Sequence, residues 1–293
     1  YDDPRGLRDY KEAFIYSMDS LTSEKDFKNF DFISYAKAGC SKDIATILYT
    51  SGTTGTPKGV LLSHENIISV AKKAAQIENL RKEDNVIAYL PMAWVGDNVF
   101  SYAQSYITGF CVNCPESIET TGQDMREIGP TYYFGPPRIF ENMLTSVHIK
   151  MEDAHPIKRV LFKYYMKVAS KVGNKIIDNK KVSFSDRINY LIGELLVYAP
   201  LKNVLGLSNV RKAYTAGEAI SPDIFKFFRS LGVNLKQLYG STEGSVYVTL
   251  QRDGEIYSDT VGTPFPDVEI KIIDGEVMFK SSGVFLGYYK NEQ

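Results

Sequence analysis

The stretch YTSGTTGTPKG, residues 49–59, decides how the rest of the sequence is interpreted. Its three glycines let the backbone curve closely, its hydroxyl and amide groups donate hydrogen bonds, and its one lysine carries a positive charge. Phosphates are recognised by such groups where a chain bends tightly around them. The stretch therefore predicts a phosphate-binding loop. The alternative is a flexible surface linker, because linkers are also rich in glycine, serine and threonine.

The loop differs from the common P-loop, in which glycine precedes the lysine and serine or threonine follows it. Here Pro57 precedes Lys58, and Gly59 follows it. An ordinary P-loop nucleotide hydrolase is therefore disfavoured. The loop also lies between two apolar runs, IATILYT and GVLLS, which is unusual for a linker.

After the loop, short apolar runs alternate with helical patterns. Residues 64–77 have the period of an amphipathic helix, and the runs VIAYL, GFCVN, TYYFG, VRKAYT and LKQLY follow in turn. This alternation predicts an α/β fold with a layered, mostly parallel sheet flanked by helices. The apolar face of the first helix is expected to comprise Ile67, Ile68, Ala71, Ala74 and Ala75.

Two sections depart from this alternation. Residues 137–207 contain only helical patterns, which predicts a helical insertion within an α/β core that spans residues 1–248. Residues 249–293 contain strand-like runs, and DVEIKII and EVMFK are joined by the turn-forming pair Asp274 and Gly275. This last part predicts the start of a smaller, β-rich subdomain.

The composition limits the class of protein. The chain has 293 residues, of which 44% are hydrophobic, so it can bury a large core. With 34 basic and 35 acidic residues there is no basic excess, and a nucleic-acid partner is not predicted. Three cysteines are too few for a disulfide framework, and the sequence shows no signal peptide. We therefore expect a cytoplasmic protein.

Two local patterns could indicate special roles, but each has a simpler interpretation. Cys111 and Cys114 form a CxxC pair, but a zinc site needs a second pair, so ordinary free thiols are expected. The most apolar run, residues 190–207, contains Glu194 and Pro200 and is too interrupted to span a membrane. It predicts a buried helix with a break.

At the level of motifs, YTSGTTGTPKGV resembles the signature of the adenylate-forming superfamily, which includes acyl-CoA synthetases, adenylation domains of peptide synthetases and luciferases. YLPMAWVGD, YTAGEAIS with LKQLYGSTEG, and VGTPFPDVEIKIIDGEVMFKSSGVFLGYYKN resemble further blocks of this family in the same order. The resemblance covers roughly residues 44–290. It implies that a carboxylate attacks the α-phosphorus of ATP, that pyrophosphate leaves, and that the acyl-adenylate reacts with a thiol, usually that of CoA.

The resemblance also implies roles for single residues. The loop from Thr50 to Gly59 would wrap the β- and γ-phosphates, with Lys58 supplying charge. Thr242 and Glu243 match the positions that contact the α-phosphate and hold Mg²⁺, for which a carboxylate is a suitable ligand. Lys58, Thr242 and Glu243 are thus the expected catalytic residues.

The remaining site residues are expected around the adenine and the acid. Tyr239 matches the aromatic residue that stacks on adenine, and Glu218 replaces a small residue common in the adenine-lining segment. Trp94 lies where the family has a residue near the carboxylate site, although a core tryptophan is the alternative. The expected nucleotide-binding set is Thr50, Ser51, Gly52, Thr53, Thr54, Gly55, Thr56, Lys58, Gly217, Glu218, Ala219, Tyr239, Gly240, Ser241 and Thr242; the metal ligands are Glu243 and Thr54; the acid contacts are Trp94, Gly217 and Gly240.

The helical section indicates which acid is activated. FGPPRIFENM resembles the VPRxxE block of long-chain acyl-CoA synthetases, and the helices after it resemble the insertion of that subgroup. We therefore expect ATP, Mg²⁺, a long-chain fatty acid and CoA as ligands. The alternatives are a ligase that activates an aryl acid or loads a carrier protein, and a non-catalytic nucleotide- or lipid-binding module.

Parts of the family pattern have no match in the sequence. The ribose-binding aspartate and the mobile C-terminal domain with its catalytic lysine are expected beyond Gln293, and a longer segment is expected ahead of the loop. The chain is therefore expected to be the central part of a longer protein and not to complete adenylation by itself.

The predicted helix over residues 157–177 carries two parallel rows. A solvated basic face over a packed apolar face explains both rows. The alternative is peripheral contact with an anionic membrane surface. The basic row is Arg159, Lys163, Lys167, Lys171 and Lys175, and the apolar row is Val160, Tyr164, Val168, Val172 and Ile176.

Overall fold

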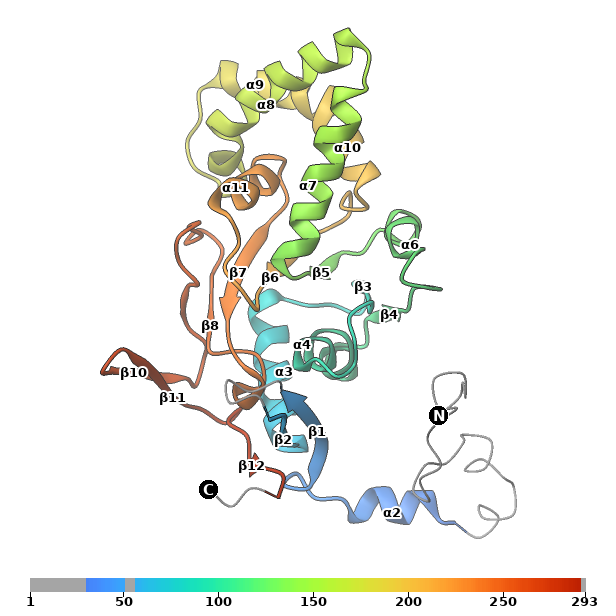
Figure 1. The fold of residues 1–293 in the computed structure, drawn as a ribbon, viewed down its shortest axis with the longest axis vertical. Helices are drawn as coiled ribbons and strands as arrows, with labels where there is room; N and C mark the ends of the chain where they lie inside the picture. The colour runs from blue at the N-terminus through green and yellow to red at the C-terminus, as the bar shows by residue number, and fades with distance from the viewer. Residues whose placement is uncertain (1–29, 51–55, 291–293) are drawn as a thin grey trace. The chain divides into compact units, whose positions relative to one another are not determined.

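The structure, a computed structural model, describes residues 30–50 and 56–290, and the chain forms two compact units, Tyr1–Asp43 and Ile44–Gln293 (Figure 1). The described part of the first unit contains helix α2, Phe32–Ala38. The carboxylate of Asp31 caps this helix by accepting a hydrogen bond from the amide of Ser34 at 3.1 Å. The second unit holds all the other elements.

A small antiparallel sheet holds the segment that enters and leaves the glycine loop. Strands β1 (Ile44–Thr50) and β2 (Lys58–Ser63) form a hairpin in which Thr50 lies opposite Lys58. Strand β12 (Gly287–Tyr288) pairs with the other edge of β2. Residues 287–289 are thereby brought beside the exit of the loop.

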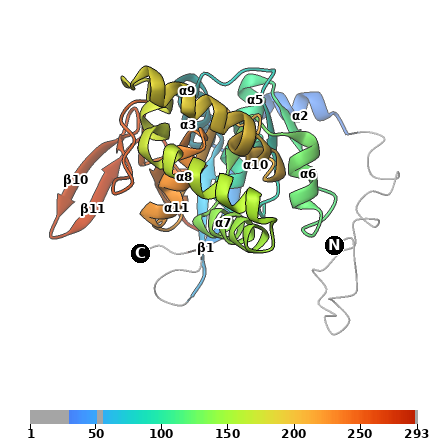
Figure 2. The same cartoon turned by 90° about the horizontal axis from the view of Figure 1, so that it is seen from above.

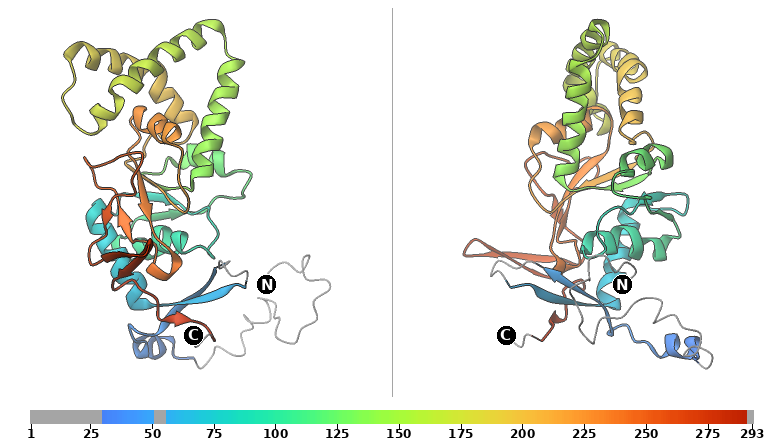
Figure 3. Two further views of the ribbon diagram at one scale, coloured as in Figure 1. Left: turned by 60° about the vertical axis from the view of Figure 1, so that its left-hand side comes forward. Right: turned by 45° about the vertical axis from the view of Figure 1, so that its right-hand side comes forward.

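The core sheet confirms the predicted α/β class. Strands β5, β6 and β7 are parallel neighbours, and the short strands β8 and β9 continue the sheet in antiparallel fashion. Strands β3 and β4 form a separate parallel pair. Figure 3 shows the core strands between the helical insertion and the β1–β2 hairpin. The bounds are β3 Asn85–Ile87, β4 Cys111–Asn113, β5 Tyr132–Phe134, β6 Lys212–Thr215, β7 Leu235–Tyr239, β8 Thr249–Leu250 and β9 Thr263–Pro264.

Helix α3 begins at a capping box. The Ser63 hydroxyl accepts from the Asn66 amide, and the Asn66 side chain accepts from the Ser63 amide. Its buried face includes Ala71 and Ala74 as predicted, but Ile68 is 47% exposed, so its expected burial is wrong. The other helices beside the sheet are α4 Val95–Asp97, a π-helix Asn98–Ala103, α5 Gln104–Thr108, α6 Thr121–Ile128 and α11 Pro222–Ser230, and α3 itself spans His64–Glu78.

The section expected to be wholly helical is helical. Figure 2 looks down on this insertion, with its helices in front of the strands. A small core of Tyr165, Ala169, Val172, Tyr190 and Tyr198 joins its helices to Leu231, which follows α11. The bounds are α7 Pro137–Glu152, α8 Pro156–Ile177, α9 Phe184–Gly193, a π-helix Glu194–Tyr198 and α10 Ala199–Val204.

Two expectations about the insertion are right only in part. In α8, Val160 and Tyr164 at the start of the expected apolar row are 67% and 52% exposed, whereas Val172 further along it is buried with Tyr165 and Ala169. The apolar run 190–207 is buried at Tyr190 and Tyr198 but exposed at Leu195, because only one side of it packs on the rest of the insertion. Within the described residues, no helix has the length and apolarity needed to cross a membrane. Membrane contact through α8 stays a prediction.

The predicted C-terminal hairpin is present. Strands β10 (Glu269–Ile273) and β11 (Glu276–Lys280) pair antiparallel, and Asp274 and Gly275 both have positive φ, as a type I′ turn requires. The domain boundary at residue 248 stays a prediction. The strand that follows it, β8, pairs with β7 of the core sheet.

A buried charge cluster lies where α3 meets β6 and β7. The Glu78 carboxylate accepts hydrogen bonds from Lys236 Nζ, at 3.1 Å to each oxygen, and from the Tyr214 hydroxyl. Lys236 also pairs with Asp253 at 2.8 Å, and Lys212 forms an ion pair with the same carboxylate. Burial alone would raise the pKa of Asp253, but hydrogen bonds from Asn234 and these lysines lower it well below its ordinary value.

Candidate active site

The site residues expected after β6 and β7 lie at one edge of the core sheet. The carboxyl ends of parallel strands meet at one edge, where ligands of open α/β sheets bind. Thr215 of β6 lies opposite Gln237 of β7, so the segments after these strands are neighbours. They contain Gly217, Glu218 and Ala219 after β6, and Tyr239, Gly240, Ser241 and Thr242 at and after the end of β7.

The two segments have the accessibility that a nucleotide site needs. Gly217 has φ 96°, a backbone conformation that favours glycine, and it is exposed together with Glu218 and Ala219. Tyr239, the last residue of β7, is 41% exposed. This exposure leaves much of its ring accessible for stacking, as the adenine role requires.

The turn that carries Glu243 is tightly constrained. A Cβ atom on Gly240 would lie 1.4 Å from the carbonyl oxygen of Val246, so only glycine fits there. Ser245 and Val246 both have positive φ, which is costly for residues with a Cβ atom. The Ser245 hydroxyl donates to the carbonyl of Gly283 at 2.7 Å and secures the turn. The short 3₁₀-helix Thr242–Gly244 is thus held in one conformation.

Lys58 and Glu243 both contact the side chain of Tyr288. The Lys58 ammonium lies 5.2 Å from the centroid of the Tyr288 ring, a cation–π contact, and the Tyr288 hydroxyl donates to Glu243 Oε1 at 3.0 Å. The backbone amide of Phe285 also donates to the Glu243 carbonyl at 2.9 Å. The exit of the glycine loop and the expected metal ligand therefore lie in one neighbourhood.

Sequence reasoning missed Tyr288. It lies in the block GYYKN, which was noted as a family motif without a role for any single residue. Its position depends on the pairing of β12 with β2, which no local pattern signals. Burial and the neighbouring Glu243 carboxylate raise the pKa of Tyr288, so its hydroxyl remains protonated and donates at neutral pH.

Trp94 lies just ahead of a segment that packs on the end of β5. It precedes α4 and is 50% exposed, so the alternative of a core tryptophan is wrong. A Cβ atom on Gly96 would lie 2.9 Å from the Phe134 ring, which shows how closely the segment after Trp94 packs on β5. Phe134 in turn stacks on Phe100, with 4.4 Å between ring centroids. The role of Trp94 toward the acid stays a prediction.

Asp97 is a buried carboxylate that sequence reasoning did not single out. It is 2% exposed and lines a cavity of about 10 Å³ between α4 and β5. Its Oδ1 accepts from the Ser101 hydroxyl at 2.8 Å, whereas its Oδ2 has no hydrogen-bond partner among the described residues. Burial raises the pKa of Asp97 above its ordinary value.

This burial predicts a pH-dependent effect of Asp97→Asn. Because the folded-state pKa of Asp97 is raised, ionisation favours the unfolded chain, so its contribution to stability falls as the pH rises through 3.8. Asparagine removes this loss. As the pH rises from acid to neutral, the urea midpoint of Asp97→Asn should therefore increase relative to the midpoint of the wild type. The exposed Asp259→Asn is the control, and a midpoint difference at Asp97 that does not change with pH contradicts the assignment.

Part of the expected loop lies outside the described residues, namely Ser51, Gly52, Thr53, Thr54 and Gly55. Thr50 ends β1, and Thr56 is exposed at the other side of the loop. The role of Thr54 as a metal ligand therefore stays a prediction.

The donor set fits a magnesium ion that is held largely by phosphates. Mg²⁺ is often bound by one or two carboxylates together with substrate phosphates. Glu243 offers such a carboxylate, and Tyr288 binds only its Oε1. Within residues 30–50 and 56–290, no cluster of three or more histidine, cysteine, aspartate or glutamate side chains could hold an ion by itself. Cys40, Cys111 and Cys114 are free, exposed thiols, and free thiols were the prediction for Cys111 and Cys114.

Comparisons with known proteins identify the family of the chain. The family model of the AMP-binding enzymes matches residues 9–289, and the chain belongs to this family.

The chain is 28% identical over 314 residues to the long-chain-fatty-acid–CoA ligase ACSBG2 of Mus musculus, covering 99% of this chain and 46% of that protein. It is 28% identical over 269 residues to the peroxisomal long chain acyl-CoA synthetase 7 of Arabidopsis thaliana, covering 86% of this chain and 37% of that protein. The chain thus spans about half the length, or less, of these curated relatives.

Solved structures of the same fold include VinN with L-aspartate, with a TM-score of 0.60 and 19% identity over 87% of this chain and 54% of that one. A long-chain-fatty-acid–CoA ligase (FadD1) from Archaeoglobus fulgidus has a TM-score of 0.56 and 20% identity, over 86% of this chain and 44% of that one. At these identities the likeness shows the fold alone.

Proposed function

We propose that the chain is the nucleotide- and acid-binding core of a long-chain fatty acid–CoA ligase that works through an acyl-adenylate. The observation that carries this proposal is that Lys58 and Glu243 both contact the side chain of Tyr288 at the edge of the core sheet. Membership of the AMP-binding enzymes supports the general reaction. The names of the relatives from Mus musculus and Arabidopsis thaliana support a long-chain acid.

In this proposal Lys58 and Glu243 have different roles toward the nucleotide. The Lys58 ammonium lies at the exit of the glycine loop and would offset negative charge on the departing pyrophosphate. Glu243 would hold Mg²⁺, which supplies positive charge to the phosphate oxygens when bound. Tyr239 and the segment after β6 would receive the adenine.

Tyr288 keeps the two groups close without neutralising either of them. Lys58 contacts the face of its ring, while the Tyr288 hydroxyl donates to one oxygen of Glu243. A direct ion pair between lysine and glutamate would compete with the phosphates and the metal ion for both charges. The tyrosine leaves the ammonium group and the second carboxylate oxygen able to bind the nucleotide.

Substrate profiling tests the proposed reaction in the complete protein that contains this chain. ATP–pyrophosphate exchange should depend on a long-chain acid such as palmitate and be much weaker with butyrate or benzoate. Exchange that prefers benzoate would indicate a ligase for aryl acids. Absence of exchange with every acid, in a protein that binds ATP, would indicate a non-catalytic binding module.

Replacing Tyr288 should affect metal-dependent turnover. Tyr288→Phe keeps the ring under Lys58 but removes the hydrogen bond to Glu243. We expect the Mg²⁺ concentration for half-maximal exchange to change by about 3- to 10-fold, because a hydrogen bond to a charged group contributes about 1.5 kcal/mol or somewhat less when partly exposed. Tyr289→Phe, at the neighbouring exposed tyrosine, is the control. An unchanged magnesium dependence in Tyr288→Phe contradicts the role.

A further inference from the structure

Helix α9 and the π-helix after it carry an apolar row that faces away from the insertion. Phe184, Ile188, Leu191 and Leu195 recur at intervals of three or four residues, which places them on one side of the helix. All four are exposed, to 81% at Phe184 and 76% at Leu195. The helix packs through its other side, where Tyr190 is buried in the core of the insertion. The row is therefore an apolar surface that no described residue covers.

Helix α8 widens this surface. The Asn189 side chain of α9 donates a hydrogen bond to the Tyr164 hydroxyl of α8 at 3.0 Å, so the two helices lie side by side. Tyr164 is exposed, and so is Val160, one turn before it on the same side of α8. Contiguous apolar patches on the surface of a protein mark places where it contacts something else. The outward sides of α8 and α9 together form such a patch.

The same two helices concentrate positive charge. Residues 156–193 contain nine lysines and arginines and only two acidic residues, whereas the whole chain has 34 basic and 35 acidic residues. Both of these acidic side chains are already in ion pairs, Asp178 with Arg229 and Asp186 with Lys171. The helix pair is thus strongly cationic in a chain whose formal net charge is −1.

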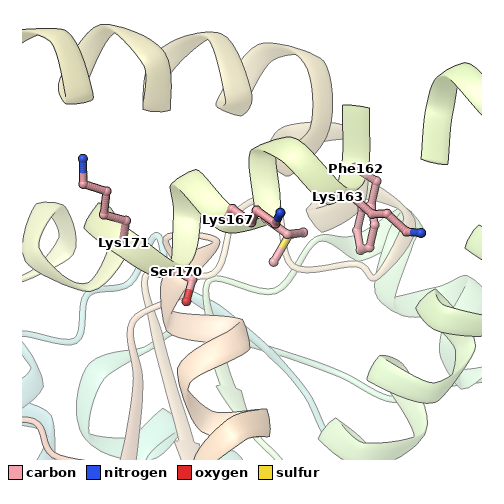
Figure 4. A pocket seen from close by; sticks show the side chains of 6 residues that line it. Phe162, Lys163, Lys167, Ser170 and Lys171 are labelled. Atoms are coloured by element: carbon pink, nitrogen blue, oxygen red, sulfur yellow. The ribbon is translucent and has the colours of Figure 1, made fainter. Parts of the chain in front are cut away.

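Lysines border the apolar patch directly. Figure 4 shows Lys163, Lys167 and Lys171 along one stretch of α8. Lys163 follows Val160 by three positions, and Lys167 follows Tyr164 by three, so each lysine is a neighbour of an exposed apolar residue on the helix surface. Over the described ranges, neither Lys163 nor Lys167 forms an ion pair. Their aliphatic stems can lie along an apolar surface while their ammonium groups contact anions.

The combination of an apolar row and unpaired lysines favours one kind of partner. A second copy of the chain would bring the same excess of positive charge to the contact, and like charges across an interface repel. A nucleic acid would match the charge but would leave the apolar row in water. A bilayer with anionic lipids matches both features, because its acyl chains receive apolar side chains and its headgroups attract lysines.

We propose that the outward sides of α8 and α9 dock on the surface of an anionic lipid bilayer. Leu191 and Leu195 enter the boundary between headgroups and acyl chains, and Lys163 and Lys167 contact the lipid phosphates and carboxylates. Helices of this kind lie in the plane of the interface. The surface uses no residue of the candidate active site, so the proposal stands or falls independently of the proposed ligase function.

Co-sedimentation of the complete protein with vesicles tests the contribution of charge. We expect binding to phosphatidylcholine vesicles that contain phosphatidylserine, weaker binding to pure phosphatidylcholine, and weakening as salt is added. Lys163→Glu/Lys167→Glu should bind the anionic vesicles about tenfold more weakly or less, because two attractive charges become repulsive. Lys271→Glu/Lys280→Glu, on the exposed β10–β11 hairpin, makes the same change in net charge and should bind about as the wild type does. Equal weakening in both double variants, or equal binding to the two kinds of vesicle, overturns the proposal.

The apolar row has its own pair of variants. Leu191→Asp/Leu195→Asp should weaken binding to the anionic vesicles by about tenfold or more, because it removes apolar contact and brings negative charge to the headgroups. Ile272→Asp/Met278→Asp replaces two exposed apolar residues of the β10–β11 hairpin and should leave vesicle binding unchanged. All four side chains are exposed, so the unfolding midpoints should stay near that of the wild type. Wild-type binding by Leu191→Asp/Leu195→Asp contradicts the proposal.

A fluorescent probe shows whether the row enters the lipid. Leu195→Cys, labelled with the environment-sensitive dye NBD in a background without other reactive cysteines, should emit as in water and shift to the blue when anionic vesicles are added. Ile272→Cys with the same label should not shift. Vesicle binding without a shift at position 195 would assign the contact to charge alone and overturn the proposal. A blue-shifted emission before vesicles are added would show that protein already covers the row, and would overturn it as well.

Discussion

Lys58→Ala should lower ATP–pyrophosphate exchange by about 10²-fold or more in the complete protein. The lysine begins β2 at the exit of the glycine loop, where its ammonium group would face the departing pyrophosphate. Loss of a charge that contributes a few kcal/mol to the transition state reduces the rate by about this factor. The measurement is the initial rate of exchange with saturating palmitate, ATP and Mg²⁺.

The control for Lys58→Ala is Lys271→Ala on the exposed strand β10. It removes the same kind of side chain away from the candidate site and should leave exchange unchanged. Equal unfolding midpoints for the two variants would show that the loss at Lys58 is not a loss of fold. A wild-type rate in Lys58→Ala contradicts the role given to this residue.

Lys236→Met should lower the free energy of unfolding by about 3–5 kcal/mol, because it leaves a buried carboxylate without its main cationic partner. Glu78 and Lys236 are each 1% exposed, and their side chains are joined at 3.1 Å. Methionine keeps the aliphatic part of the lysine but removes its charge. Urea unfolding, with the slope measured for each protein, gives the comparison.

Lys73→Met is the matched control for this prediction. It breaks the ion pair with Asp267, whose partners have side chains that are 29% and 49% exposed, so it should cost less than about 1 kcal/mol. The double variant Glu78→Gln/Lys236→Met should recover part of the loss, because no charged carboxylate is left at position 78. Equal losses in Lys236→Met and Lys73→Met would contradict the structural role of the buried cluster.

Local patterns in the sequence predicted the fold well. The period of residues 64–77 indicated α3, and the pair Asp274 and Gly275 indicated the turn of the last hairpin, because both signals depend on neighbouring residues alone. The exposed Val160 shows the limit of such patterns. A period identifies a helix, but the stripe that packs is decided by the other elements.

The candidate site was predictable only in part. Motifs indicated Lys58 and Glu243, but the residue between them, Tyr288, depends on the pairing of β12 with β2. The partner of Glu78 is likewise 158 residues away in the sequence, at Lys236. Contacts of this kind arise from the tertiary fold and leave no periodic signal in a single sequence.

A crystal of the complete protein with Mn²⁺ and a non-hydrolysable ATP analogue tests the central claim most directly. Mn²⁺ replaces Mg²⁺ and is located by its anomalous scattering. The account predicts one manganese peak at the Glu243 carboxylate, phosphates within reach of Lys58, and loss of the peak in Glu243→Gln. A triphosphate bound away from Lys58, or a metal ion that does not contact Glu243, would contradict the account.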